Sequence, residues 1–242
     1  MNDKEKLYMD EDVVLSVENV HKCYGTKEVL NGVNFNARKG KIIGFFGPNA
    51  SGKSTLVKII NGLTTLDNGK IIVGGEDIGI NSKKIISYLP ERTYLNDWMK
   101  VKDIIDFFDD FYEDFKRGKA IKMFYDMNID LNSKLKTLSK GTKEKVQLVL
   151  VMSREAELYI LDEPIAGVDP AARSYIMKSI LTNLPESSTL MIVTHLINDI
   201  ETICDEVIFL NDGKIVIHED TDVLRQRYSK SIDAIFREEF KC

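Results

Sequence analysis

A glycine-rich segment, Gly47-Pro-Asn-Ala-Ser-Gly-Lys-Ser-Thr55, has the residue types and the spacing of a loop that holds phosphate groups. Glycines let backbone N–H groups approach a phosphate without clashes from Cβ atoms. In this pattern Lys53 reaches the β- and γ-phosphates, and the Ser54 hydroxyl is placed to bind Mg²⁺. The residues that the loop assigns to nucleotide binding are Gly47, Asn49, Ala50, Ser51, Gly52, Lys53, Ser54 and Thr55. The segment therefore predicts a site for a nucleoside triphosphate.

Such a loop works only between a strand and a helix, and the flanking residues supply both. The apolar run Ile42–Phe46 is typical of a buried strand, and the run Thr55–Ile60 has the pattern of an amphipathic helix. The helix N-terminus adds partial positive charge beside the phosphates.

Two adjacent carboxylates follow another apolar strand, in Leu158-Tyr-Ile-Leu-Asp-Glu-Pro164. Ligands bind at the carboxyl ends of strands in α/β sheets. There Asp162 can hold Mg²⁺, and Glu163 can orient or deprotonate a water for attack on a γ-phosphate. Taken alone, the pair also fits a solvent-facing acidic turn; the phosphate loop favours the catalytic interpretation.

Two further segments carry polar groups beside helices or strands. Leu138-Ser-Lys-Gly-Thr142 precedes a helical run, Lys143–Met152, and is either a second anion site or an ordinary N-cap by Ser139. Val193-Thr-His195 places a histidine at a strand end, where a side chain would face phosphate.

Composition limits the class of protein. The chain has 242 residues, of which 43% are hydrophobic and 29% charged, with a net charge of −5. This size suits one large domain, and the mild acidity argues against a dedicated nucleic-acid binder. Three widely spaced cysteines favour a reducing compartment over a disulfide or zinc framework. The charged N-terminus predicts no signal peptide, and no apolar run reaches the length of a membrane span.

Strand and helix patterns alternate along much of the chain, which predicts a largely parallel sheet. Residues 197–203 and 222–240 have helical patterns, the latter with an apolar face that includes Val223 and Leu224, and Asn211-Asp-Gly213 predicts a hairpin turn. Strands are expected at Val13–Val20, Gly32–Asn36, Gly69–Gly74, Lys84–Leu89, Leu158–Leu161 and Thr189–Val193, with a helix at Ala171–Leu181.

Between Arg92 and Lys136 strand patterns give way to helical periodicity. One predicted helical face carries Ile104, Phe108, Phe111, Tyr112 and Phe115, and acidic residues occupy most of the rest. We interpret this stretch as a helical insertion whose aromatic stripe packs into a core.

The order of these motifs resembles the ATP-binding subunit of ABC transporters over essentially the whole chain. The resemblance implies that Tyr24 stacks on adenine, that Gly47–Thr55 is Walker A, that Ile160–Glu163 is Walker B with its catalytic glutamate, and that His195 is the switch histidine. It also matches Leu138–Thr142 to the signature motif, with Ser139 and Gly141 facing phosphate, and Gly167–Asp169 to the D-loop, which brings Asp169 to the nucleotide.

Two positions depart from the family pattern. Glu91 stands where the family usually has a glutamine, and as a carboxylate it can still bind Mg²⁺ or a water. Lys140 replaces the first of two adjacent signature glycines and either attracts the γ-phosphate or points to solvent, while Thr142 replaces the final glutamine. Both departures resemble exporter ATPases whose membrane partner is a separate ABC-2-type polypeptide.

This resemblance implies an α/β fold: a P-loop NTPase core with a mostly parallel sheet, an N-terminal antiparallel β subdomain and a helical subdomain. The expected division is one domain, with residues 1–91 and 143–220 as the core, 92–142 as the helical subdomain and 221–242 as a helical tail. The implied partners are a second ABC ATPase subunit and a transmembrane permease at the cytoplasmic face of a bacterial membrane. The implied activity is Mg²⁺-dependent ATP hydrolysis that drives export of a drug, peptide or lipid.

Three other functions compete with this interpretation. A non-transport ABC ATPase acting in DNA repair or translation would usually add a second ABC domain, a coiled coil or basic extensions, which the sequence lacks. A P-loop kinase or GTPase would have no use for the signature and D-loop segments. A subunit that senses ATP with little hydrolysis stays open because of Glu91 and the altered signature.

Overall fold

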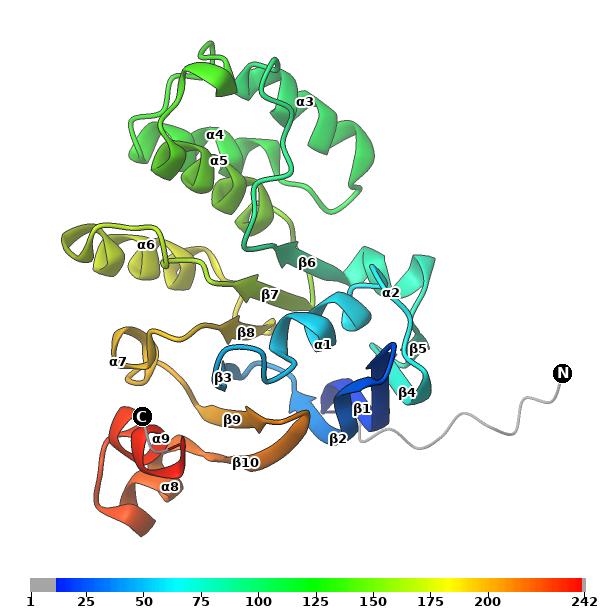
Figure 1. Cartoon of the computed structure of the whole chain (residues 1–242). Helices are drawn as coiled ribbons and strands as arrows, with labels where there is room; N and C mark the ends of the chain where they lie inside the picture. Colours follow the sequence, from blue (N-terminus) through cyan, green and yellow to red (C-terminus); the bar gives the residue numbers. More distant parts are fainter. Residues whose placement is uncertain (1–11, 241–242) are drawn as a thin grey trace, which may run out of the picture.

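The computed structural model describes residues 12–240 of the chain (Figure 1). The strands are β1 (Val13–Tyr24), β2 (Lys27–Arg38), β3 (Ile42–Phe46), β4 (Asn68–Val73), β5 (Glu76–Asp77), β6 (Ile86–Leu89), β7 (Leu158–Asp162), β8 (Thr189–Val193), β9 (Glu206–Asn211) and β10 (Lys214–Asp220). The helices are α1 (Lys53–Ile60), α2 (Ile80–Ile85), α3 (Val101–Phe111), α4 (Arg117–Asp126), the 3-10 turn η1 (Leu135–Thr137), α5 (Lys140–Met152), α6 (Pro170–Asn183), α7 (Ile197–Ile200), α8 (Thr221–Tyr228) and α9 (Ile232–Phe240).

The strands form two sheets. An antiparallel sheet has the order β2-β1-β4-β5, and a six-stranded sheet has the order β10-β9-β3-β8-β7-β6. In the larger sheet every neighbouring pair is parallel except β10 with β9. The expected α/β fold, with a mostly parallel sheet and an N-terminal antiparallel sheet, is confirmed.

The central strands are buried on both faces, as their nearly continuous apolar sequences require. Along β7, Leu158 and Ile160 face a core shared with α1 and the antiparallel sheet, whereas Tyr159 and Leu161 face the opposite core. Helices α3, α4 and α5, which we call the helical layer, belong to this second core and project beyond β6 and β7 (Figure 1). Because β3, β8 and β7 are parallel neighbours, their carboxyl ends meet at one edge of the sheet.

Most expected elements are confirmed, including β3, β8 and the hairpin at β9–β10. The two hairpin turn residues, Asp212 and Gly213, have φ values of 44° and 73°. Positive φ at both central positions is what a two-residue turn needs to match strand twist.

The expected strand at Lys84–Leu89 is wrong in its first half. Helix α2 runs to Ile85 and β6 begins only at Ile86. The Ser82 hydroxyl accepts a hydrogen bond from the Gly79 N–H at 2.9 Å and so caps the helix start. This local cap favours a helical turn over the strand that the apolar pattern predicted.

The expected aromatic stripe is also partly wrong. Helix α3 ends at Phe111, whose side chain is 68% exposed, whereas Phe115 lies beyond the helix but is buried in the expected core. The buried face of α3 instead consists of Val101, Ile104, Ile105 and Phe108. Phe111 stacks on Phe107 at the surface, with ring centroids 5.9 Å apart. The helix presents its first two turns, not its last, to the core.

Two smaller corrections concern the C-terminal half. The helix expected through residue 203 ends at Ile200 as α7. The predicted tail helices are present as α8 and α9, but Val223, placed on their apolar face, is exposed. Leu224, Ile232 and Ile235 fill the space against the core instead.

Candidate nucleotide and catalytic site

The loop between β3 and α1 is built so tightly that two of its positions accept only glycine. A Cβ on Gly47 would lie 2.3 Å from the Leu210 carbonyl oxygen. Gly52 has φ +111°, and a Cβ there would lie 2.8 Å from the Val29 carbonyl oxygen. Helix α1 has no side-chain cap, and its first intrahelical bond is Leu56 N–H to the Gly52 carbonyl. The preceding N–H groups therefore stay available for an anion.

A cavity of about 440 Å³ opens above this loop. It gathers residues from the ends of β1, β3, β6, β7 and β8, although they lie far apart in the sequence. The predicted residues that line it are Tyr24, Asn49, Ala50, Gly52, Lys53, Ser54, Thr55, Glu91, Asp162, Glu163 and His195. Gly47 and Ser51 do not line the cavity, and they pack closely, since a Cβ on Gly47 would lie 2.7 Å from the buried Ser51 hydroxyl.

Lys53 is the buried cation of this cavity. Its ammonium donates to the carbonyl oxygens of Gly47 at 2.7 Å and Pro48 at 2.9 Å. Burial lowers the pKa of Lys53, and the charges of Glu163 and Asp162 oppose that shift. A triphosphate would add the negative charge that this partly desolvated ammonium favours.

Asp162, the last residue of β7, carries the most altered carboxyl group of the site. Burial, assisted by the charges of Glu163 and Glu91, raises the pKa of Asp162 to about 6, against the opposing effect of Lys53. Concentrated carboxylate charge of this kind fits a hard divalent cation, which would relieve the repulsion.

Glu163 is held in place by the residues that follow β8. Its carboxylate accepts hydrogen bonds from the Thr194 hydroxyl at 2.8 Å and the His195 N–H at 3.1 Å, and the His195 Nδ1 lies 2.8 Å away. Glu163 also has a left-handed backbone, with φ +54°. Such a conformation costs about 1–3 kcal/mol in a non-glycine residue, and three contacts from one short segment keep the carboxylate there.

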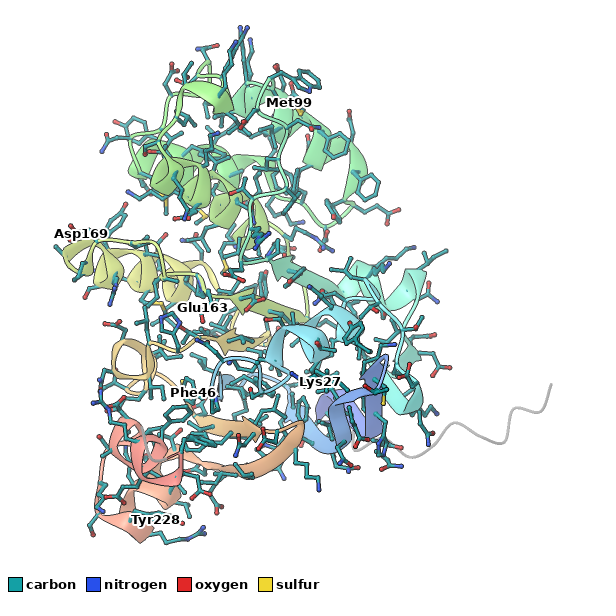
Figure 2. All side chains as sticks on the ribbon, in the orientation of Figure 1. Lys27, Phe46, Met99, Glu163, Asp169 and Tyr228 are labelled. Atoms are coloured by element: carbon teal, nitrogen blue, oxygen red, sulfur yellow. The ribbon has the colours of Figure 1, made fainter. Side chains whose placement is uncertain are left out.

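The exposure of this group suits catalysis. The Glu163 side chain is 15% exposed and the His195 ring 57% exposed, so the ring covers the carboxylate and still reaches the cavity. Figure 2 shows Glu163 at the end of β7 and Lys27 on β2. Sequence reasoning missed Thr194, whose only signal was its place between a strand and His195, and it missed Lys27, Val29 and Ala166 in the lining.

The signature and D-loop residues stand apart from this cavity. Ser139 caps α5 by accepting from the Thr142 N–H at 3.2 Å, and Asp169 caps α6 by accepting from the Ala171 N–H at 2.9 Å. Neither they nor Gly141 line the cavity. The Lys140 side chain is 88% exposed, its ammonium 3.9 Å from Glu144. It extends to solvent, at the rim of a smaller cavity beside Glu91.

Comparison with known proteins places this geometry in a family. The family model described as ABC transporter matches residues 30–166, which include the phosphate loop, the signature segment and Glu163. Since this is more than half of the chain, the protein belongs to the ABC transporter family.

Individual proteins agree with this assignment. The linearmycin resistance ATP-binding protein LnrL of Bacillus subtilis is 29% identical over 84% of this chain and 68% of its own length. The Nod factor export ATP-binding protein I of Rhizobium sp. is 29% identical over 84% and 69%, respectively. A solved ATP-binding subunit of an ABC transporter has a TM-score of 0.83 and 25% identity, covering 93% of this chain and 98% of that one.

The protein is therefore an ATP-binding subunit of an ABC transporter and an ATPase, which acts together with transmembrane components of a transporter complex. Across residues 12–240, no helix has the length and apolar character needed to cross a bilayer.

Proposed function

We propose that this subunit hydrolyses ATP within a dimer, in which the signature loop of one ABC ATPase closes over ATP held by the phosphate loop of the other. The observation that carries this proposal is that Ser139 and Gly141 do not line the cavity. Residues suited to bind phosphate, to hold Mg²⁺ and to activate water do line it. One chain supplies Lys53 and the α1 N-terminus on one side of the γ-phosphate. A second chain would supply donors on the other, with Asp169 at the same junction.

Within the cavity, Tyr24 would stack on adenine, since its ring is exposed at the rim. The Ser54 hydroxyl, Asp162 and Glu91 would hold Mg²⁺ beside the triphosphate, and phosphate oxygens would complete its shell. The residues described include no cluster of three or more acidic, histidine or cysteine side chains able to hold a metal alone. Bound Mg²⁺ supplies charge neutralisation of the triphosphate.

Glu163 is the group that we assign to water activation. Its carboxylate is fixed by Thr194 and His195, lines the phosphate cavity and can accept a proton from a water attacking in line. The exposed His195 ring would hold the γ-phosphate geometry from the same side. Loss of the γ-phosphate after hydrolysis would remove the link between the two subunits and let them separate.

We propose that the transported cargo is a drug, peptide or lipid, exported through a separate ABC-2-type membrane subunit. Support comes from the exporters among the relatives and from exposed aromatic side chains between Glu91 and Phe115, namely Trp98, Phe107 and Phe111. Exposed aromatic side chains suit a membrane partner at the cytoplasmic face. The net charge of −5 disfavours a nucleic-acid role.

The expected division into one ABC domain with a core, a helical part and a C-terminal tail is retained as a proposal. Helix α5 begins at Lys140 and runs to Met152, so the boundary expected at residue 142 falls within its first turn. We therefore place the whole of α5 with the helical layer.

A second candidate function is ATP sensing with little hydrolysis. The observation in its favour is Glu91, which lines the cavity beside Asp162 and adds to the negative charge that raises the pKa of Asp162. A carboxylate there would weaken ATP turnover by opposing the triphosphate charge.

The test compares wild type with Glu163→Gln, measuring Mg²⁺-dependent phosphate release and the mass of the protein in solution with and without ATP. We expect turnover in the wild type and an ATP-dependent dimer of the variant. Lys53→Ala is the control, because it should bind ATP weakly and stay monomeric. An ATP-bound wild type without turnover or dimer would favour the sensing function.

A further inference from the structure

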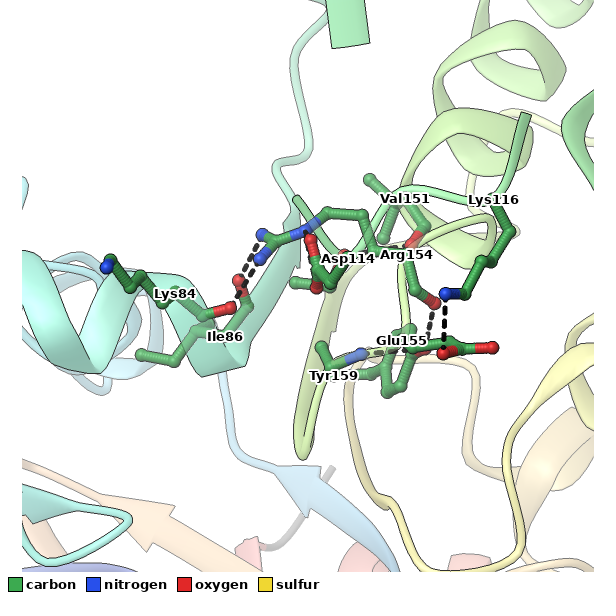
Figure 3. Close-up of polar contacts among 10 residues, drawn as sticks. Lys84, Ile86, Asp114, Lys116, Val151, Arg154, Glu155 and Tyr159 are labelled. Carbon is green, nitrogen blue, oxygen red and sulfur yellow. Dashed lines mark hydrogen bonds and ion pairs between the residues drawn. The ribbon is translucent and has the colours of Figure 1, made fainter. Parts of the chain in front are cut away.

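The connection from the helical layer to β7 contains a buried arginine that also contacts the start of β6. Arg154 follows the C-terminal end of α5, and its side chain is 5% exposed. Its NH1 group donates to the Ile86 carbonyl at 2.6 Å, and NH2 donates to the Lys84 carbonyl at 2.6 Å (Figure 3). The guanidinium thus joins the chain that leaves the helical layer to the chain that enters β6 on its way to Glu91.

The same guanidinium also holds the connection between α3 and α4. Its Nε donates to both carboxylate oxygens of Asp114, at 3.0 and 3.1 Å. The Tyr112 ring lies against it, with 4.1 Å between the guanidinium carbon and the ring centroid. Asp114 neutralises the buried charge, and the ring packs on its flat face.

Backbone contacts fix the arginine on its own segment. The Glu155 N–H donates to the Asp114 carbonyl at 3.0 Å, and the Lys116 N–H donates to the Ser153 carbonyl at 2.7 Å. The buried Tyr159 hydroxyl donates to the Arg154 carbonyl, which ties this segment to β7 (Figure 3). The position of the guanidinium is therefore determined by β7 as well as by the helical layer.

Only arginine has the geometry for this junction. Its planar fork carries donors pointing in several directions, whereas a lysine ammonium is a single point charge. Here those donors serve two carbonyls on one segment and a carboxylate on another.

We propose that Arg154 is a positioning residue that sets the angle between the helical layer and the central sheet, and thereby places Ser139 relative to the ATP cavity. The consequence for turnover rests on the proposed dimer mechanism, but the angle itself is a property of the single subunit.

The length of α5 explains how a contact at its far end affects the signature loop. The helix has 13 residues, which corresponds to about 20 Å. A tilt of about 10° at its C-terminal end would move the N-terminal end by about 3.5 Å over that length. Ser139 caps that N-terminal end, so a small change at Arg154 would misplace it against a partner subunit.

The first experiment measures this angle in the monomer without nucleotide. Spin labels are placed at Lys122 on α4 and Gln226 on α8, two exposed positions, after replacement of the accessible cysteines by serine. We expect one narrow distance distribution in the wild type, and a distribution shifted or broadened by several ångströms in Arg154→Met. Arg154→Lys should be intermediate, because it keeps the charge without the fork. Superimposable distributions for wild type and Arg154→Met would overturn the proposal.

A matched control separates positioning from general loss of stability. Leu15→Ala removes a buried side chain in β1, in the core that contains neither labelled helix, and should lower the melting temperature without altering the distribution. If Leu15→Ala broadens the distribution as much as Arg154→Met, the positioning role is wrong. If Arg154→Met does not fold, the same spin-label distances are measured in Asp114→Asn and Arg154→Lys, and a shift in these variants supports the positioning role.

The second experiment adds these changes to Glu163→Gln and measures ATP affinity and dimerisation separately. We expect ATP affinity within about twofold of the parent, since Arg154 is not in the cavity lining, and a dimer weakened at least tenfold. Equal dimerisation with an altered monomer angle would contradict the link from Arg154 to Ser139. If Glu163→Gln itself forms no dimer, the proposed function fails while the monomer distances still test the angle.

Discussion

Helices α1 and α5 each have a glycine at or near the N-terminus, Gly52 and Gly141, but the two N-termini differ in how their N–H groups are satisfied. The α1 N-terminus has no side-chain cap, opens into a cavity and carries the buried Lys53. The α5 N-terminus is capped by Ser139, whose hydroxyl also lies 2.8 Å from that of Thr142, and it is exposed.

This difference fits the proposed dimer, in which the α1 N-terminus binds a phosphate held by its own chain. The α1 N–H groups are left for a phosphate that one chain can enclose together with Asp162 and Glu163. In α5 the Thr142 N–H is satisfied by the Ser139 side chain, and this cap is worth about 1 kcal/mol. In the proposed dimer, the signature loop would exchange this cap for contacts with the γ-phosphate of a partner subunit.

The largest expected effect is on ATP turnover, when Glu163, the proposed general base in the cavity at the α1 N-terminus, is replaced. Glu163→Gln should lower kcat at least about 100-fold, because a positioned general base contributes a factor of that size or more. ATP affinity should stay near the wild-type value, since phosphate binding is assigned to Lys53 and α1. Phosphate release and equilibrium nucleotide binding measure the two quantities. A variant with normal turnover would remove Glu163 from its role.

A second test uses the raised pKa of Asp162. Its folded pKa of about 6 exceeds the ordinary value of 3.8. As pH rises between these values, the folded state retains a proton that the unfolded state has released, so stability falls, and above pH 6 the loss levels off at about 3 kcal/mol. Asp162→Asn should therefore be more stable than wild type by up to that amount at pH 7, with no difference below about pH 4.

Urea unfolding between pH 4 and pH 8 measures this difference. Asp110→Asn, which alters an exposed carboxylate on α3, is the control and should show no such trend. If the stability difference between Asp162→Asn and wild type does not depend on pH, the loss of stability does not come from the charge on Asp162.

Two glycine substitutions test the difference between the N-termini of α1 and α5. Gly52→Ala should destabilise the isolated subunit by about 1–3 kcal/mol, because φ +111° and the Val29 carbonyl exclude a Cβ. Gly141 is helical, and a Cβ there meets nothing within 4 Å. Gly141→Ala should stabilise the monomer by about 0.5–1 kcal/mol, yet weaken the ATP-dependent dimer. Melting curves and dimer masses test both, and a Gly141→Ala variant that dimerises normally would argue against close approach of a partner.

The smallest effect is expected at the α5 cap. Ser139→Ala should cost about 1 kcal/mol of monomer stability and Ser139→Gly only a few tenths. If Ser139 also contacts the phosphate of a partner, both variants should weaken dimerisation equally. Dimerisation that instead follows monomer stability, with Ser139→Gly near wild type, would limit Ser139 to its capping role.

Local chemistry in the sequence determined much of the ATP site. The loop could be predicted from the spacing of Gly47 and Gly52 before Lys53, because few other loop types require glycines at this spacing. The carboxylates after β7 were predicted because an apolar run must end at a sheet edge. Thr194 was missed, since its bond to Glu163 depends on β7 and β8 being neighbours in the sheet.

The sequence by itself thus determined the α/β class, the ATP-binding loop and the residues able to do the chemistry. Only the tertiary structure decided that Phe111 is exposed and that Ser139 and Asp169 stand outside the cavity. The contacts of Arg154 were also decided only by the tertiary structure, because its partners, Lys84, Ile86 and Asp114, are 40 to 70 residues away in the sequence. Local sequence patterns indicate the secondary structure and the buried face of each segment, whereas the contacts between segments depend on how the strands and the helical layer pack.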